Sequence, residues 1–351
     1  MNLRPAVPAL AAALLFGAST PLAKLLLGSM PPQLLAGLLY LGSGAGLGTL
    51  LALRRLRDGA AAPSLRIPAR DLPWLLGAIA AGGVAGPVLL MLGLRHTPAA
   101  SAALLLNLEG VFTAVLAWLV FRENADRRIV LGMAAIVAGG LLLAWQPGSG
   151  LAWSAGAGLV AAACLAWAID NNLTRKVSTH DALLIAGLKG ALAGAVNTAL
   201  ALASGAAWPA LPAVLGSLLV GFVGYGLSLV LFVVALRNLG TARTGAYFSV
   251  APLFGVLVAL ALWPQWPAAT FWLAAALMAL GVWLHVREQH VHLHHHKPMD
   301  HTHRHRHDAH HQHTHDFPWD GREPHTHPHH HPALTHSHAH VPDIHHRHSH
   351  G

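Results

Sequence analysis

Two carboxylic acids, Glu109 and Asp170, lie inside long apolar stretches of this chain, where ionisable side chains are rare. Glu109 falls near the middle of the apolar stretch 99–121. On insertion scales, a charged side chain at the centre of a bilayer costs about 2.5–3.5 kcal/mol, so such residues face a cavity or a partner and often carry protons or ions. Glu109 is therefore the first candidate to bind a proton, an ion or a charged ligand. The alternative is a structural ion pair, for which Lys189 is a candidate partner.

Three further polar residues bear on that choice. Thr113 is four residues beyond Glu109 and shares its helix face, whereas Asn107, two residues back, points largely elsewhere. Lys189 lies well inside the apolar stretch 182–202 and is a counter-ion candidate for either carboxylate. We therefore expect Thr113 to line the same cavity as Glu109.

Asp170 is followed by Asn171 and Asn172, and this polar triplet interrupts an apolar sequence. Asp170 and Asn171 are candidates to bind a substrate or a cation. Equally, Asp170 can pair with Arg175 or cap the end of its helix. Tyr225 is a candidate pore-lining residue, although single polar residues in such helices more often serve packing or interhelical hydrogen bonds.

The elements that must position these residues are membrane-spanning helices, since a span needs roughly 20 mostly apolar residues. The fold class is an all-α membrane protein with ten transmembrane helices. The only cysteine, Cys164, lies in the sixth span, so no intramolecular disulfide can form. The expected spans are 8–27, 33–53, 72–94, 99–121, 129–145, 153–173, 182–202, 211–236, 244–263 and 268–285.

The basic residues indicate the orientation of these spans. Alternate connecting segments, counted from the N-terminus, hold thirteen Lys or Arg residues, whereas the segments between them hold only Arg95. Positive residues concentrate on the cytoplasmic side of membrane proteins. We therefore predict a multi-pass membrane protein with both termini in the cytoplasm, and we assign the formal charge of +8 to topology, with no nucleic acid as partner.

The two halves of the membrane domain carry a faint internal repeat. Segment 94–104 has a partner 142 residues on, at 236–246, and segment 16–24 has a fainter one 151 residues on, at 167–175. Five spans per half is an odd number, so the second copy enters the membrane from the opposite side. Inverted repeats of this kind are typical of transporters, with substrate bound between the halves. We expect one five-helix repeat at 1–145 and a second at 146–286.

Several motifs resemble the drug/metabolite transporter superfamily, EamA type. They are LGLRHTPAASAALL at 92–105 followed by VFTA at 111–114, FGAST at 16–20, and segment 246–255 with its proline at 252. The resemblance covers nearly all of residues 5–286. It implies a ten-helix, inverted-repeat secondary carrier of small metabolites, amino acids or drugs, usually in a bacterial inner membrane. Members commonly carry a Gly-Glu pair after the fourth and ninth helices, where this chain has Arg122-Glu123 and Trp263-Pro264.

The tail, 287–351, holds 25 of the 28 histidines, many in alternating runs. It is poor in apolar residues and interrupted by proline, so it is expected to be disordered. Closely spaced imidazoles bind Zn, Ni, Co or Cu. The tail is equally compatible with a metal buffer, a pH sensor and a passive extension. The candidate metal ligands are His301, His303, His305, His307, His327, His329, His338 and His340.

Two main functions follow from the sequence. The first is a secondary carrier in a lipid bilayer for a small-molecule substrate, with no required cofactor and with Glu109 at its coupling or substrate site. The alternative is a divalent transition-metal transporter fed or regulated by the tail, although the spans hold no paired histidines. A metal-responsive sensor would need a signalling domain, which the sequence does not contain. No nucleophile motif or phosphate-binding loop is present, so we expect neither an enzyme nor an ATP-driven pump. The sequence does not specify an oligomeric state.

Overall fold

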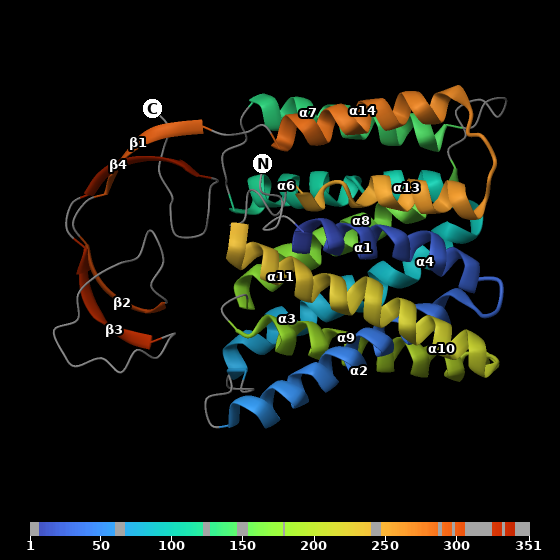
Figure 1. Cartoon of the computed structure of the whole chain (residues 1–351), viewed down its shortest axis with the longest axis horizontal. Coiled ribbons are helices and arrows are strands. Elements are labelled where there is room, and N and C mark those ends of the chain that lie inside the picture. The colour runs from blue at the N-terminus through green and yellow to red at the C-terminus, as the bar shows by residue number, and fades with distance from the viewer. Residues whose placement is uncertain are drawn as a thin grey trace. The chain divides into compact units, whose positions relative to one another are not determined.

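The structure is a computed structural model that describes residues 7–59, 67–121, 127–145, 154–177, 180–239 and 247–286, with four strands in the tail. Its contacts divide the chain into two units, Met1–Glu288 and Gln289–Gly351, and each is described here by itself. The first unit is a bundle of helices, whose α-helices are labelled in Figure 1. In the ranges below, η marks short 3-10 and π segments.

The first repeat supplies five spans. The third combines four helical segments and the fourth combines two. In order they are α1 (Val7–Leu26); α2 (Pro32–Asp58); η3 (Ala69–Asp71), α3 (Leu72–Ala78), η4 (Ile79–Ala85) and α4 (Gly86–His96); α5 (Ala99–Leu105) and α6 (Leu108–Phe121); and α7 (Arg127–Ala144).

The second repeat follows the same plan. Its spans are α8 (Ala155–Thr174) with η5 (Arg175–Val177); α9 (Ala182–Ala203); α10 (Leu211–Val220), η6 (Gly221–Leu227) and α11 (Ser228–Leu239); α13 (Ala251–Leu262); and α14 (Ala269–Val286). Within the described residues, six helical segments are long and apolar enough to cross a membrane, and three shorter apolar helices lie at Val130–Ala144, Ala251–Leu262 and Ala269–Leu284. The predicted all-α membrane fold is confirmed.

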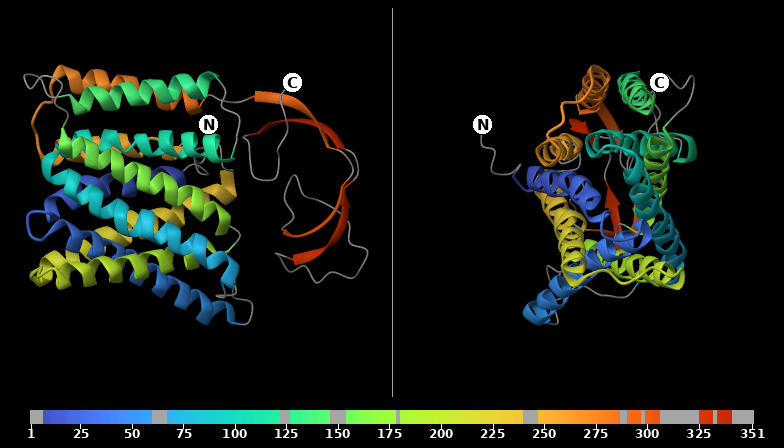
Figure 2. Two further views of the ribbon diagram at one scale, coloured as in Figure 1. Left: turned by 180° about the vertical axis from the view of Figure 1, so that it is seen from behind. Right: turned by 90° about the vertical axis from the view of Figure 1, so that its right-hand side faces the viewer.

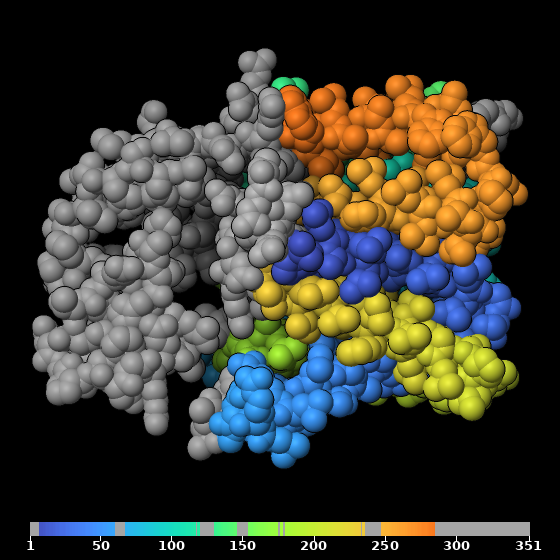
Figure 3. Space-filling view, in the orientation of Figure 1, coloured from blue at the N-terminus to red at the C-terminus, as the bar shows by residue number. Residues whose placement is uncertain are grey.

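The helices of the two repeats pack in a reciprocal pattern. The second spans pair with each other, as α2 with α9, and so do the fifth spans, as α7 with α14. Helix α1 packs against α11 and α13 of the second repeat, and Figure 3 shows it between them on one face of the bundle. In return, α8 of the second repeat packs between α6 and α4 of the first, as the rear view in Figure 2 shows. Each first span is therefore embedded in the opposite repeat, as the predicted inverted repeats require.

Each repeat contains a π-helix at the equivalent position of its third span. Segments η4 and η6 are both seven residues long, and each interrupts the third span of its repeat. Because η4 begins at residue 79 and η6 at residue 221, they are separated by the same 142 residues that relate segments 94–104 and 236–246. The π-helix is rare and often marks a functional position.

Small residues allow the central pair of helices to approach closely. A Cβ atom added at Gly44 of α2 would lie 2.3 Å from the backbone nitrogen of Ala191 in α9, and one added at Gly190 would lie 2.6 Å from the nitrogen of Gly44. Helices in lipid gain stability through such close packing, because no hydrophobic effect drives them together. The α2–α9 pair therefore forms a tight interface between the repeats.

Helix ends in the bundle are satisfied by charged side chains. Asp181 caps α9 by accepting hydrogen bonds from the backbone nitrogens of Leu183 and Leu184, at 2.9 and 3.2 Å. At the end of α4, the Lys24 ammonium donates to the backbone oxygens of Leu94 and Thr97. A carboxylate at a helix start and an ammonium at a helix end also suit the helix dipole.

The tail unit contains strands where a chain without secondary structure was expected. β1 (His290–His296) pairs antiparallel with β4 (Leu334–His340), and β2 (Met299–His305) pairs antiparallel with β3 (His325–His331). Backbone hydrogen bonds form such ladders without an apolar core, and alternating sequences match their period of two. The candidate ligand His307 lies outside the described residues.

Candidate transport site

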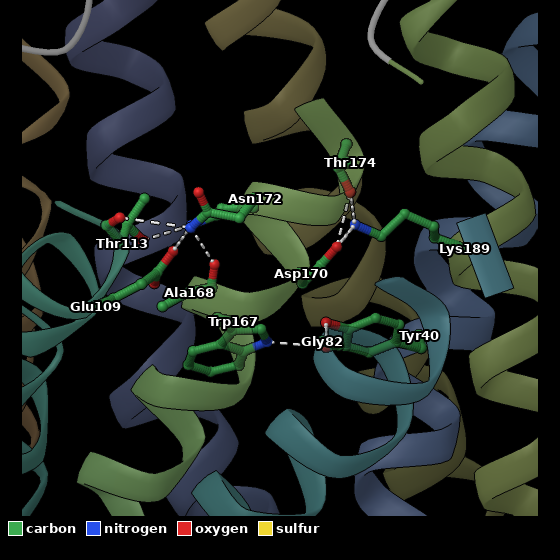
Figure 4. A network of polar contacts seen from close by, with 11 residues as sticks. Tyr40, Gly82, Glu109, Thr113, Trp167, Ala168, Asp170, Asn172, Thr174 and Lys189 are labelled. Atoms are coloured by element: carbon green, nitrogen blue, oxygen red, sulfur yellow. Dashed lines mark hydrogen bonds and ion pairs between the residues drawn. The ribbon is translucent and has the colours of Figure 1, made fainter. Parts of the chain in front are cut away.

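The polar end of α8 serves two separate clusters. Consecutive residues on an α-helix are turned by about 100° from each other, so Asp170 and Asn171 face different neighbours. Asn171 faces α6 of the first repeat, whereas Asp170 faces α9. Figure 4 shows both clusters on the same stretch of α8.

The first cluster is built around Glu109, at the start of α6. The Asn171 side-chain amide donates to Glu109 Oε1 at 2.9 Å and to Thr113 Oγ1 at 3.3 Å. The neighbouring Asn172 amide donates to the backbone oxygens of Thr113 and Ala168, at 3.4 and 2.8 Å. The structure thus brings together Glu109, Thr113 and Asn171, and Thr113 shares the face of Glu109 as the helical spacing predicted. Among the described side chains, no ion pair joins Glu109 to a basic group.

Asn171 is an exposed residue on an otherwise buried face of α8. Its side chain is exposed, yet it lies on the same face of α8 as Cys164 and Trp167, which are 0 and 7% exposed. Leu165 and Ile169 mark a different, apolar exposed face of this helix. Because residues four and seven positions apart share a helix face, Asn171 lies on the same face of α8 as these buried residues, and it contacts α6 there. Glu109, its partner on α6, is half-buried.

The second cluster is a buried ion pair. The Lys189 ammonium contacts both carboxylate oxygens of Asp170, at 2.5 and 2.7 Å, and donates to Thr174 Oγ1 at 3.2 Å. The Thr174 hydroxyl donates to Asp170 Oδ1 at 2.7 Å. The Asp170 and Lys189 side chains are only 8 and 18% exposed. Of the two carboxylates for which Lys189 was a candidate counter-ion, the structure pairs it with Asp170, whereas the Arg175 side chain lies outside the described ones.

The π-helix η4 lies next to this ion pair and accepts hydrogen bonds from three neighbouring helices. Tyr40 Oη and Trp167 Nε1 both donate to the backbone oxygen of Gly82, each at 2.9 Å. The Asn197 amide donates to the adjacent oxygen of Gly83 at 3.1 Å. A side chain at position 82 would meet Asp170, since an added Cβ would lie 2.0 Å from Asp170 Oδ2. η4 thereby fastens α2, α8 and α9 together around the ion pair.

A row of aromatic side chains extends from Tyr40 into the second repeat. The ring of Tyr40 lies 5.6 Å from that of Tyr225, which in turn lies 6.1 Å from Phe16. Phe248 lies 5.6 Å from Phe16 and 4.8 Å from Phe232. The half-buried Tyr225, a predicted pore-lining residue, therefore belongs to a row of five rings drawn from both repeats. Sequence reasoning did not single out the other four rings, although Phe16 and Phe248 lie in the family-like segments 16–20 and 246–255.

The fourth span changes partner along its length. Its first part, α5, packs against α1 and α13, whereas its second part, α6, packs against α8. The α5 contact is tight: an added Cβ at Gly255 of α13 would lie 2.9 Å both from Ala103 Cβ in α5 and from the backbone oxygen of Gly17 in α1. The repeats are therefore closed against each other at the α5 end of this span.

Comparisons with known proteins agree with this architecture. The family model described as EamA-like transporter family matches residues 4–145 and 154–287. This chain belongs to the EamA-like transporter family. It is similar to an uncharacterized transporter of Methanothermobacter thermautotrophicus, at 29% identity over 273 residues, covering 71% of this chain and 76% of the relative. A crystal structure of a protein with 19% identity superposes with a TM-score of 0.58, over 79% of this chain and 95% of that one, and shows the fold alone.

For this EamA-like transporter, the two family matches coincide with the two sets of five spans. Glu109 and Thr113 of the first set meet Asn171 of the second, and small molecules are its expected cargo. Among the described side chains, no group of three His, Cys, Asp or Glu residues is placed to hold a metal ion. The side chains of the predicted tail ligands are outside the described ones.

Proposed function

We propose that this membrane transporter is a secondary carrier of small organic molecules, in which Glu109 binds the coupling ion or the charged group of the substrate. The observation that carries the proposal is the contrast between its two membrane carboxylates. Asp170 is neutralised by Lys189, whereas the side-chain hydrogen bond described for Glu109 comes from the neutral amide of Asn171.

An acid in a membrane interior needs a proton, a cation or a basic partner to offset its desolvation. The amide of Asn171 orients Glu109 without neutralising it. A proton or a substrate ammonium group that reaches Glu109 would supply the missing partner. That exchange, repeated on each side of the membrane, is the coupling step of a secondary carrier.

The aromatic row favours substrates that combine an amine with an apolar or ring-shaped part. Rings separated by 4.8–6.1 Å form a continuous apolar wall, with the hydroxyls of Tyr40 and Tyr225 as polar points. Aromatic faces attract cations as well as other rings. Amino acids and amine-bearing drugs or metabolites fit this chemistry.

Alternating access would come from the two ends of the fourth span, α5 and α6, opening in turn. Inverted-repeat carriers expose a central site to each side in turn by moving one group of helices against the other. We assign the basic end of the bundle to the cytoplasm of a bacterial cell, with the protein in its inner membrane. Protease accessibility of the tail in right-side-out vesicles tests that orientation.

The carrier is tested by reconstitution into proteoliposomes. Labelled amino acids and hydrophobic amines are compared for uptake driven by an imposed proton gradient. Glu109→Gln and Asn171→Ala are expected to abolish and to weaken uptake, respectively. Asn107→Ala is the matched control, because Asn107 donates to the backbone oxygen of Leu104 in its own chain segment and not to Glu109.

Two results would count against this function. If Glu109→Gln transports as well as the parent protein, the carboxylate has no coupling or binding role. If Zn, Ni or Co is transported and the organic panel is not, the alternative of a divalent-metal transporter replaces the carrier proposed here.

A further inference from the structure

The paired strands of the tail place histidines opposite histidines. Ribbon 1 is β1 with β4, and ribbon 2 is β2 with β3. In ribbon 1 the opposed pairs, here called rungs, are His290 with His340, His292 with His338 and His294 with His336. In ribbon 2 they are His301 with His329, His303 with His327 and His305 with His325.

The rungs of each ribbon share one face, because alternate residues of a strand lie on the same side of a sheet. The positions between them hold a different chemistry. In ribbon 2 these are Asp300 with His330, Thr302 with Pro328, and Arg304 with Thr326. In ribbon 1 they are Val291 with Ala339, Leu293 with Ser337, and His295 with Thr335. Histidine is thus concentrated on one face of each ribbon.

The spacing of this face suits a transition-metal ion. Opposed residues in an antiparallel pair have Cβ atoms about 4.5–5.5 Å apart. Neighbouring rungs are separated by two residues, or about 7 Å along the strand. Four imidazoles from two adjacent rungs can therefore meet around one ion, as a four-coordinate site with metal–nitrogen bonds of about 2.0–2.1 Å requires.

We propose that each ribbon binds one divalent transition-metal ion between adjacent histidine rungs, so that the tail holds two such ions per chain. Neutral imidazole is a preferred ligand of Zn, Ni and Cu, whereas Mg and Ca prefer oxygen ligands. The ribbons would then act as a selective metal store. This function does not depend on the carrier mechanism, since the tail can bind metal whether or not the bundle transports it.

The experiment compares two variants of ribbon 2 in the purified full-length protein. His303→Gln with His327→Gln removes the central rung, and His305→Gln with His325→Gln removes an outer one. Zn²⁺ alone is added against a competing chelating dye, so that only tightly held ions are counted. We expect two tight ions for the parent protein and for the outer-rung variant, because that variant keeps two adjacent rungs.

The central-rung variant is expected to keep one tight ion, in ribbon 1. Its remaining rungs in ribbon 2 are four residues, or about 13 Å, apart, which is too far for four imidazoles on one ion. His331 lies two residues beyond His329 on β3, so His301, His329 and His331 remain as three candidate ligands. The affinity of ribbon 2 for Zn²⁺ therefore falls without vanishing. The fall should be at least the roughly tenfold cost of losing an outer-shell partner.

A second pair of substitutions, His310→Gln with His311→Gln, removes the same number of histidines outside both ribbons and should change nothing. Equal effects of all three double variants would overturn the proposal, because they would mean that any histidine in the tail replaces any other. Absence of tight binding in the parent protein would overturn it as well. Transport by a tail-deleted protein is measured separately, so failure here leaves the carrier proposal standing.

Discussion

Replacing Lys189 with Met is expected to destabilise the bundle strongly, because Asp170 would be left buried without its partner. The ion pair is short, with contacts of 2.5 and 2.7 Å, and the two side chains are only 18 and 8% exposed. Removing one member of such a pair costs about 3–5 kcal/mol, since the remaining charge stays desolvated. We expect a loss of that size in the free energy of unfolding.

The double variant Lys189→Met with Asp170→Asn should recover most of that loss. Asparagine can still accept the hydrogen bond that Thr174 now donates to Asp170 Oδ1, and no charge is buried. Replacing a whole buried pair by neutral groups is often nearly neutral in stability. Arg57→Ala serves as the control, because the Arg57 side chain is 87% exposed and its pair with Asp58 is worth less than about 1 kcal/mol.

Unfolding is followed by tryptophan fluorescence in detergent with increasing SDS. If Lys189→Met loses no more stability than Arg57→Ala, the Asp170–Lys189 pair is not desolvated as inferred here. If the single variant is destabilised and the double variant does not recover, Lys189 stabilises the bundle through contacts other than its charge. Uptake by the double variant then tells whether Asp170 has any role beyond this pair.

Three further outcomes follow from the packing. Gly82→Ala should lower the unfolding temperature, because the added Cβ would lie 2.0 Å from Asp170 Oδ2. Gly158→Ala is the control: a Cβ at position 158 meets open space, so this change should be neutral or stabilising by up to about 1 kcal/mol. Gly255→Leu should abolish proteoliposome uptake and lower the unfolding temperature, because it separates α13 from α1 and α5; normal uptake would show that this contact need not close. Cys164, which is buried, should gain a maleimide adduct by mass spectrometry in SDS but not in the folded protein.

The spans were predictable because hydropathy sums over many residues and tolerates local error. The predicted range 72–94, for example, corresponds to the continuous run Ala69–His96. The ninth span was expected at 244–263; the structure describes this part of the chain from residue 247 on, and α13 covers Ala251–Leu262. The π-helices η4 and η6 could not be predicted from the sequence, because hydropathy does not distinguish a π turn from an α turn.

The partners within the site could be predicted only along a single helix. Glu109 and Thr113 share a face because they are four residues apart, and this follows from helix geometry alone. The choice of Lys189 between two carboxylates depends on the rotation of α9 relative to α8, which the sequence does not contain. The same holds for the hydrogen bonds of Tyr40 and Trp167 to Gly82, which depend on how three helices meet.

The matching π segments also bear on the ancestry of the chain. Two seven-residue segments at equivalent positions are most simply inherited from one ancestral five-helix protein that already contained the wider turn before its gene was duplicated. Separate later insertions would have had to occur at the same residue in both copies. Living single-copy descendants of that ancestor, assembling as antiparallel dimers, would be expected to keep the wide turn in their third helix.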